Sequence, residues 1–96
     1  MSFSISDFFV ELRLLDIDDL LLMTMLNNDI LPSTAARHLG LTPPAVSHRI
    51  KKLKDIFGDD IFEPDRVKRI PTEKGRELFA RAELALKTIE GKHDPL

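Results

Sequence analysis

Cysteine is absent from the 96 residues, and so are tryptophan and tyrosine. The chain therefore has no disulfide, no thiolate metal ligand and no thiol nucleophile, which suits a reducing, cytoplasmic setting. The longest apolar run, residues 20–26, is interrupted by Thr24 and is far too short to span a bilayer. No basic residue precedes Arg13, and Asp7 and Glu11 interrupt the early apolar stretch, so no secretory signal is indicated. We therefore expect a cytoplasmic protein without a membrane partner.

Signatures of catalysis and of cofactor binding are missing as well. The sequence contains no glycine-rich phosphate loop, no nucleophile elbow and no HExxH pattern. The acidic pairs Asp18-Asp19 and Asp59-Asp60 lie at predicted helix starts or turns, where carboxylates favour the helix dipole and solvent. The three histidines show no metal-ligand spacing, and no tyrosine or tryptophan offers a stacking platform for single strands. We expect no catalytic residue, no metal, no cofactor and no enzymatic activity.

The charge of the chain is unevenly distributed. Its length and its 43% of hydrophobic residues fit one small domain, and the formal net charge of −2, taken alone, argues against a nucleic-acid partner. Residues 1–32 hold one basic residue against six acids, whereas residues 33–58 hold five against one. Such asymmetry indicates a polyanionic partner. The alternative is that these lysines and arginines simply solvate one helix face.

Apolar spacing and capping residues predict a mainly α-helical fold. The predicted helices span residues 6–15, 17–27, 34–39, 43–57 and 73–90. The expected N-caps of the last four are Asp16, Ser33, Thr42 and Thr72, and the expected terminating glycines are Gly40, Gly58 and Gly91. Pro43 suits the first helical position because its missing N–H costs nothing there.

The segment after the fourth predicted helix has a different pattern. Residues 61–70 predict two short strands around a polar turn at Pro64-Asp65. The last helix carries a coiled-coil seam with two apolar neighbours, which predicts a dimerisation face made of Leu78, Phe79, Ala82, Ala85, Leu86 and Ile89. We expect residues 1–15 to form an extra N-terminal helix, residues 16–70 a domain, residues 71–91 a linker helix and residues 92–96 a loose tail.

The helix over residues 43–57 is amphipathic, with one apolar side and one side that is polar and basic. Its apolar residues share one side, and the other side is expected to present Pro44, Ser47, His48, Lys51 and Lys52. With the short helix and the glycine turn before it, this is a helix-turn-helix pattern, in which the second helix enters the major groove. The predicted hairpin would be its wing, with Arg66, Lys68 and Arg69. The same geometry also occurs in many proteins that bind no DNA.

Three stretches are more specific than the geometry. S-T-A-A-R-H-L-G-L-T-P-P-A-V-S-H-R-I-K-K-L-K begins at Ser33, I-F-G-D-D-I-F follows it, and P-T-E-K-G opens the last helix. Together they resemble the N-terminal winged helix-turn-helix domain of LysR-type transcriptional regulators, over residues 16–91. The resemblance implies a three-helix core, a short β-hairpin wing and a long C-terminal dimerisation helix. It also implies a homodimer that binds a pseudo-palindromic double-stranded DNA site and regulates transcription.

The resemblance also implies roles for single residues. Positions matching Pro43, Pro44, Ser47 and His48 face the bases, and those matching Arg49, Lys51 and Lys52 serve the backbone or the helix flank. His48 is the candidate for base readout, because a ring nitrogen can donate to guanine. Ser33 and Thr42 are expected to cap helices and to reach phosphate from there, and Thr34 is expected to bind DNA beside Ser33. The basic residues of the wing are expected at the minor groove or its phosphates.

Three departures from the family pattern bear on these expectations. The family often has glutamine where Pro43 stands, so readout leans on Ser47 and His48. It usually has arginine at the position of Pro64, which puts a strong wing contact in doubt. Family members carry a large C-terminal effector-sensing domain, whereas these residues are expected to form an excised domain or a free-standing short regulator, with no small-molecule ligand. The alternative function is therefore an interaction module that heterodimerises with longer relatives through its last helix and blocks them.

Overall fold

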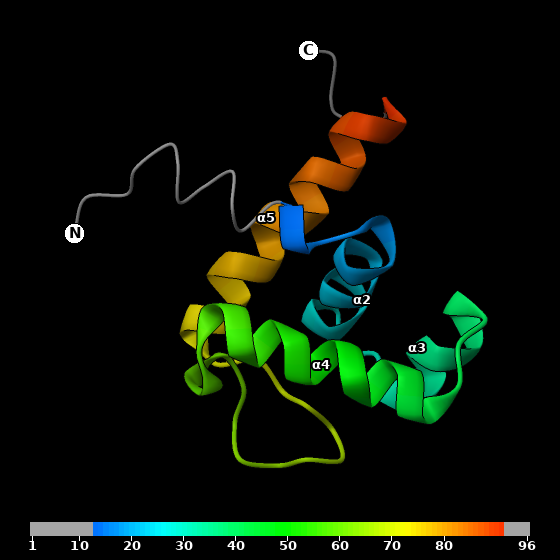
Figure 1. The fold of residues 1–96 in the computed structure, drawn as a ribbon. Coiled ribbons are helices and arrows are strands. Elements are labelled where there is room, and N and C mark those ends of the chain that lie inside the picture. The colour runs from blue at the N-terminus through cyan, green and yellow to red at the C-terminus, as the bar shows by residue number, and fades with distance from the viewer. Residues whose placement is uncertain (1–12, 92–96) are drawn as a thin grey trace.

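The computed structural model describes residues 13–91, which are mainly helical (Figure 1). The elements are α2 (Ile17–Asn27), α3 (Pro32–Leu39), α4 (Pro43–Phe57), the 3-10 helix η1 (Asp59–Ile61) and α5 (Glu73–Glu90). The bounds of α2, α4 and α5 are those that the sequence predicts. The predicted tail 92–96 and all but the last three residues of the predicted helix 6–15 lie outside the described residues. No helix within residues 13–91 combines the length and the apolar character that crossing a membrane requires.

Local capping signals explain where most of these helices begin and end. The Asp16 carboxylate accepts a hydrogen bond from the Asp19 N–H, and Asp19 accepts one from the Asp16 N–H, which makes a capping box at the start of α2. Thr42 accepts from the Ala45 N–H, and Thr72 accepts from the Gly75 N–H. These side chains satisfy backbone donors that the first helical turn leaves without partners.

The predicted N-cap at Ser33 is wrong. Helix α3 begins at Pro32, its N-cap residue is Leu31, and no side chain caps it. The fixed φ of proline suits the first helical position, and the Ala35 N–H already donates to the Leu31 carbonyl at 2.9 Å. The helix therefore starts two residues earlier than predicted, and Ser33 lies within its first turn.

Apolar side chains from all four α-helices and from η1 meet in one core. Leu22, Leu53 and Phe79 are fully buried in it, and the ring of Phe79 lies 5.6 Å from that of Phe62. Helix α5 packs along α2, while α3 packs against both α2 and α4. Because Leu53 anchors the inner side of α4 to this core, the opposite side of α4 faces outward.

The predicted β-hairpin is wrong as well, because the described residues form no β-strands there. Within residues 13–91 the only β-pairing is a single antiparallel bridge between Phe62 and Pro71, and the chain between them forms a loop beside α4 (Figure 1). The Glu63 N–H donates to the Ile70 carbonyl at 2.7 Å, but the ladder goes no further. Pro64 has no N–H to donate, and the Asp65 carboxylate accepts from two backbone N–H groups of the turn, so local turn bonds replace strand pairing.

Candidate nucleic-acid interface

The first half of α4 presents a continuous exposed surface. Pro43, Pro44, Ser47, His48 and Lys51 are all exposed, as the sequence predicts. Their positions follow from helical periodicity, because the core takes the side of α4 that carries Val46, Ile50 and Leu53. On this exposed side, two prolines begin the helix, Ser47 and His48 follow, and the basic Lys51 lies one turn after Ser47. Such a surface suits a helix that lies in the groove of a polyanion.

The turn between α3 and α4 fixes where this surface begins. Gly40 has a φ of 68°, a left-handed conformation that costs other residues free energy, and its N–H closes the end of α3. Thr42 is exposed at the N-cap of α4, Ser33 is exposed on α3, and Thr34 is half-buried. The sequence prediction did not include Arg37, which is also exposed on α3.

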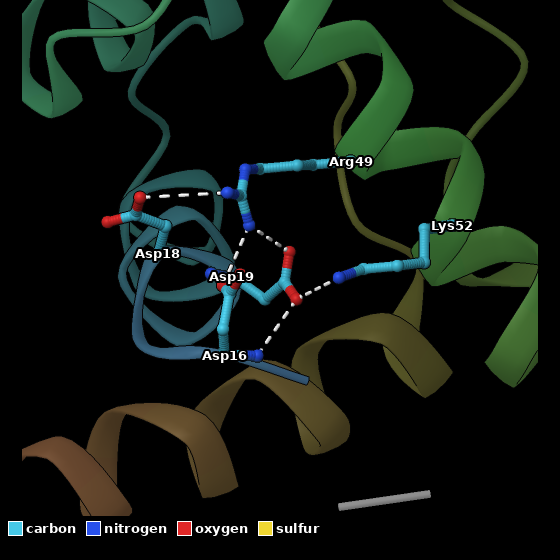
Figure 2. A network of polar contacts seen from close by, with 5 residues as sticks. All are labelled: Asp16, Asp18, Asp19, Arg49 and Lys52. Atoms are coloured by element: carbon cyan, nitrogen blue, oxygen red, sulfur yellow. Dashed lines mark hydrogen bonds and ion pairs between the residues drawn. The ribbon is translucent and has the colours of Figure 1, made fainter. Parts of the chain in front are cut away.

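Lys52 lies on a half-buried flank of α4 and not on the outer side where the helical periodicity predicts it, and Arg49 lies on the same flank. Figure 2 shows both side chains reaching from α4 to three carboxylates at the start of α2. Arg49 Nη1 donates to Asp16 Oδ1 at 2.7 Å and to Asp19 Oδ1 at 2.9 Å, and its Nη2 lies 3.6 Å from Asp18 Oδ2. Lys52 Nζ donates to the other carboxylate oxygen of Asp19. We call Asp16, Asp18 and Asp19 the acidic cluster.

The contacts between Asp16 and Arg49 shift the pKa of both groups. Burial acts to raise the pKa of Asp16, but hydrogen bonds from the Asp19 N–H and from Arg49 outweigh it, so this pKa lies below its ordinary value of 3.8. Burial acts to lower the pKa of Arg49, and its hydrogen bonds to Asp19 and Asp16 outweigh that effect and raise it. Both shifts favour the charged forms, as expected for an ion pair. The sequence analysis predicted Asp16 as an N-cap, as observed, but attributed Asp18 and Asp19 to the helix dipole and solvent, although the Asp16–Asp19 spacing was a signal for a capping box.

The loop of residues 63–70, where the sequence predicts the wing, is here called the wing loop, and its basic residues differ in their surroundings. Arg66 and Lys68 are exposed, whereas Arg69 is half-buried, with its guanidinium 5.8 Å from the centre of the Phe62 ring. Arg69 also has a φ of 52°, in the left-handed region. Asp65 uses its carboxylate to accept from the Val67 and Lys68 N–H groups at 2.8 and 3.1 Å, which shapes the loop.

The predicted dimerisation residues divide between two environments. Phe79, Ala82 and Leu86 are buried on the side of α5 that faces this chain's own core. Leu78 is half-buried, and Ala85 and Ile89 are exposed. Ile89 belongs to an open groove between α2 and α5, whose other apolar lining residues are Ile17, Leu21 and Leu86. Only part of the predicted face is therefore accessible to a second chain.

Residues 13–91 contain no group of three His, Asp or Glu side chains arranged to hold a metal ion. Every buried side-chain nitrogen and oxygen among them has a hydrogen-bond partner. The polar groups available for recognition are therefore on the surface of the molecule.

Comparison with known proteins agrees with this geometry. Residues 33–76 match the family described as "Bacterial regulatory helix-turn-helix protein, lysR family". The chain is 33% identical over 81 residues to the HTH-type transcriptional regulator SyrM 1 of Sinorhizobium fredii (strain NBRC 101917 / NGR234), covering 84% of this chain and 24% of the relative. It is 35% identical over 81 residues to the HTH-type transcriptional activator NagR of a Ralstonia species, covering 84% and 27%.

The extent of these matches defines what is shared. The chain spans about a quarter of the length of these two relatives. No solved structure gives a significant match. The matched segment contains α3, α4, the wing loop and the first turn of α5. Residues 33–76 therefore belong to the lysR family of bacterial helix-turn-helix regulators.

Proposed function

We propose that this chain binds specific sequences of double-stranded DNA and regulates transcription, with α4 as its recognition helix. The observation that carries the proposal is the exposed first half of α4, which offers Ser47 and His48 beside Lys51, with none of residues 13–91 packed over them. A helix of this width fits the major groove, and its first turns reach base edges. The names of SyrM 1 and NagR, which describe transcriptional regulators, support the same function.

The proposed contacts follow from exposure and chemistry. Ser47 and His48 read base edges, and Pro43 and Pro44 pack against them. Phosphate contacts come from Lys51 on α4 and from the wing residues Arg66, Lys68 and Arg69. Thr42 and the α3 residues Ser33 and Thr34 add contacts near helix starts, where backbone N–H groups favour an anion. For Arg49 and Lys52 the acidic cluster suggests another role.

The test is selection of a binding site from a pool of random duplexes, followed by fluorescence anisotropy on the selected and a scrambled duplex. We expect the wild-type chain to prefer the selected duplex, by about a thousandfold or more. His48→Ala is expected to lower affinity for the selected duplex by about 1–3 kcal/mol and to leave affinity for the scrambled duplex nearly unchanged. Equal losses on both duplexes would remove His48 from base readout. Failure of the pool to enrich any sequence would contradict specific recognition.

A second copy of the chain is the partner that this proposal includes. Two recognition helices held by one dimer match two half-sites about one DNA turn apart, on a pseudo-palindromic site. The exposed apolar side chains of Ile17 and Ile89 beside the α2–α5 groove support a dimer interface there.

The same groove favours one other candidate function. A chain that pairs with longer relatives through this surface would block them and need bind little DNA itself. Mixing the purified chain with such a relative distinguishes the two functions. Heterodimer formation that releases the relative from its DNA site, by a chain that binds no duplex alone, would favour the blocker.

A further inference from the structure

Three cations on α4 occupy two different environments. The side chain of Lys51 is 74% exposed, whereas those of Arg49 and Lys52 are only 20% and 30% exposed. All three are basic and neighbouring in sequence, so composition alone does not distinguish them. The difference is that Arg49 and Lys52 lie on the flank of α4 that faces the start of α2 (Figure 2).

The acidic cluster holds these two cations firmly. The Asp19 side chain is fully buried, and its oxygens accept from Arg49, from Lys52 and from the Asp16 N–H. Moving either cation to a DNA phosphate would leave part of this buried carboxylate without a partner. Breaking a buried pair in this way is strongly unfavourable, and one phosphate contact is not expected to compensate for it.

The cluster also changes the charge of the flank. Three carboxylates surround one guanidinium and one ammonium group, so the five side chains together carry a net negative charge. A negatively charged group of residues repels phosphate at distances within the Debye length, about 8–10 Å at moderate salt. The flank of α4 that looks basic in the sequence therefore contributes little attraction to a polyanion.

We propose that the acidic cluster withholds Arg49 and Lys52 from DNA phosphates and fixes the orientation of α4, so that non-specific attraction is low and discrimination rests on Ser47 and His48. This inference rests on the proposed function. Arg49 and Lys52 are then positioning residues, which act on DNA through the placement of α4. Of these three cations, Lys51 is the one that reaches phosphate, because its partner Asp55 is itself exposed.

The salt dependence of binding tests this assignment, because a purely structural role does not alter the number of phosphates contacted. The probe is a duplex of random sequence, about 30 base pairs long, which accommodates two half-sites one turn apart. Lys51→Gln is expected to reduce the slope of log K against log salt by about 0.9 per bound chain. Arg49→Gln is expected to leave the slope at the wild-type value. A reduction by Arg49→Gln equal to that by Lys51→Gln would overturn the inference.

A second variant tests the acids directly. Asp16→Asn/Asp18→Asn removes two negative charges, and asparagine caps a helix as well as aspartate does, so α2 is expected to fold. We expect the affinity for the random duplex to rise roughly fivefold and selectivity to fall, because the flank loses two negative charges and Arg49 keeps Asp19 as its only acidic partner in the cluster. The charge-matched control is Asp29→Asn/Glu73→Gln, at exposed positions outside the cluster, with an expected change of less than about twofold. Equal gains in both double variants would overturn the inference.

The same measurements separate this inference from the proposed function. If the wild-type chain binds neither a selected nor a random duplex, the proposed function and the inference both fail. If it binds and prefers its selected site, but Arg49→Gln lowers the salt slope, only the inference fails.

Discussion

Asp19 is the most constrained polar residue in the described chain. It is the single charged residue among the buried side chains of residues 13–91, and it accepts hydrogen bonds from a backbone N–H and from two cations. A buried carboxylate is costly unless its oxygens are all paired, and here they are. Since its partners come from α4, residue 19 couples the start of α2 to the proposed recognition helix.

Replacement of Asp19 by alanine should therefore destabilise the fold substantially. We expect Asp19→Ala to lower the free energy of unfolding by about 3 kcal/mol, because Arg49 and Lys52 lose their buried partner and the capping box is lost. Urea denaturation followed by circular dichroism measures the change. Asp55→Ala, which breaks only the exposed pair with Lys51, should change stability by less than about 0.5 kcal/mol. Similar losses in the two variants would contradict the assigned importance of Asp19.

Gly75 is required for a steric reason. It is buried in the first turn of α5, and a Cβ added there would lie 2.1 Å from the Ile61 carbonyl oxygen. Although alanine favours helix by about 1 kcal/mol, this contact with backbone is expected to reverse the gain. We expect Gly75→Ala to destabilise by about 2 kcal/mol or more, measured as a shift in thermal midpoint. Gly91→Ala is the control, because Gly91 has positive φ and open space around it, so about 1 kcal/mol of backbone cost is expected. A stabilised Gly75→Ala variant would contradict the close packing of α5 on η1.

At the scale of an element, the starts of α3 and α4 offer a matched pair of substitutions. The Thr42 hydroxyl caps α4, whereas Ser33 lies inside α3, which no side chain caps. Thr42→Ala is expected to lower stability by about 1 kcal/mol, and Ser33→Ala to change it by no more than a few tenths. Chemical denaturation of both variants checks the difference. A larger loss from Ser33→Ala would mean that α3 begins where the sequence predicts, at Thr34.

The helices were predictable because their ends depend on neighbours within a few residues. Asp16, Thr42 and Thr72 mark the starts of α2, α4 and α5, and the left-handed glycines Gly40 and Gly91 mark the ends of α3 and α5. The start of α3 was missed because proline supplies the first helical residue without any polar cap, so a serine nearby was misleading. The predicted wing strands failed for a similar reason, since Asp65 turns the loop with its own carboxylate.

Other features of the candidate site could not be predicted because they depend on contacts between distant elements. The hydrogen bond from Arg49 to Asp19 joins residues that are 30 apart in sequence. Helical periodicity places a cation on one flank of a helix, but it does not reveal whether an acid of another helix pairs with that cation. On α5, the apolar spacing predicts a stripe of apolar residues, but it does not show which of them pack into the chain's own core and which stay on the surface. Phe79 and Leu86 fill the core, while Ile89 remains exposed.

For the whole molecule, the net charge of −2 conceals how the charges are paired. Arg49 and Lys52 are bound to the acidic cluster, and Lys51 pairs with Asp55 across exposed side chains, where water and salt weaken the interaction. The positive field around α4 is therefore smaller than its sequence indicates. Non-specific affinity for DNA is expected to be low, and two linked recognition helices would compensate through simultaneous binding at two half-sites.

Dimerisation and DNA binding should therefore be coupled through the surface at Ile89. Ile89 and Leu84 are similarly exposed, at 66% and 62%, but Leu84 lies about 140° round α5 and away from the groove that Ile89 lines. We expect Ile89→Asp to convert a dimer into a folded monomer, because a carboxylate buried in an apolar interface lacks a partner. Leu84→Asp should remain dimeric. Analytical ultracentrifugation measures the two states, and thermal unfolding confirms that both variants fold.

The consequence for DNA binding distinguishes this dimer from a monomeric binder. Ile89→Asp is expected to lower affinity for a duplex with two half-sites by about tenfold or more, and to leave affinity for a single half-site unchanged, since only the link between the two recognition helices is lost. Leu84→Asp should match the wild type on both duplexes. A wild-type chain that is monomeric at the concentrations where it binds, or an equal loss from both variants, would place the interface elsewhere. Retention of the two-half-site advantage by a monomeric Ile89→Asp chain would mean that DNA itself brings the two copies together.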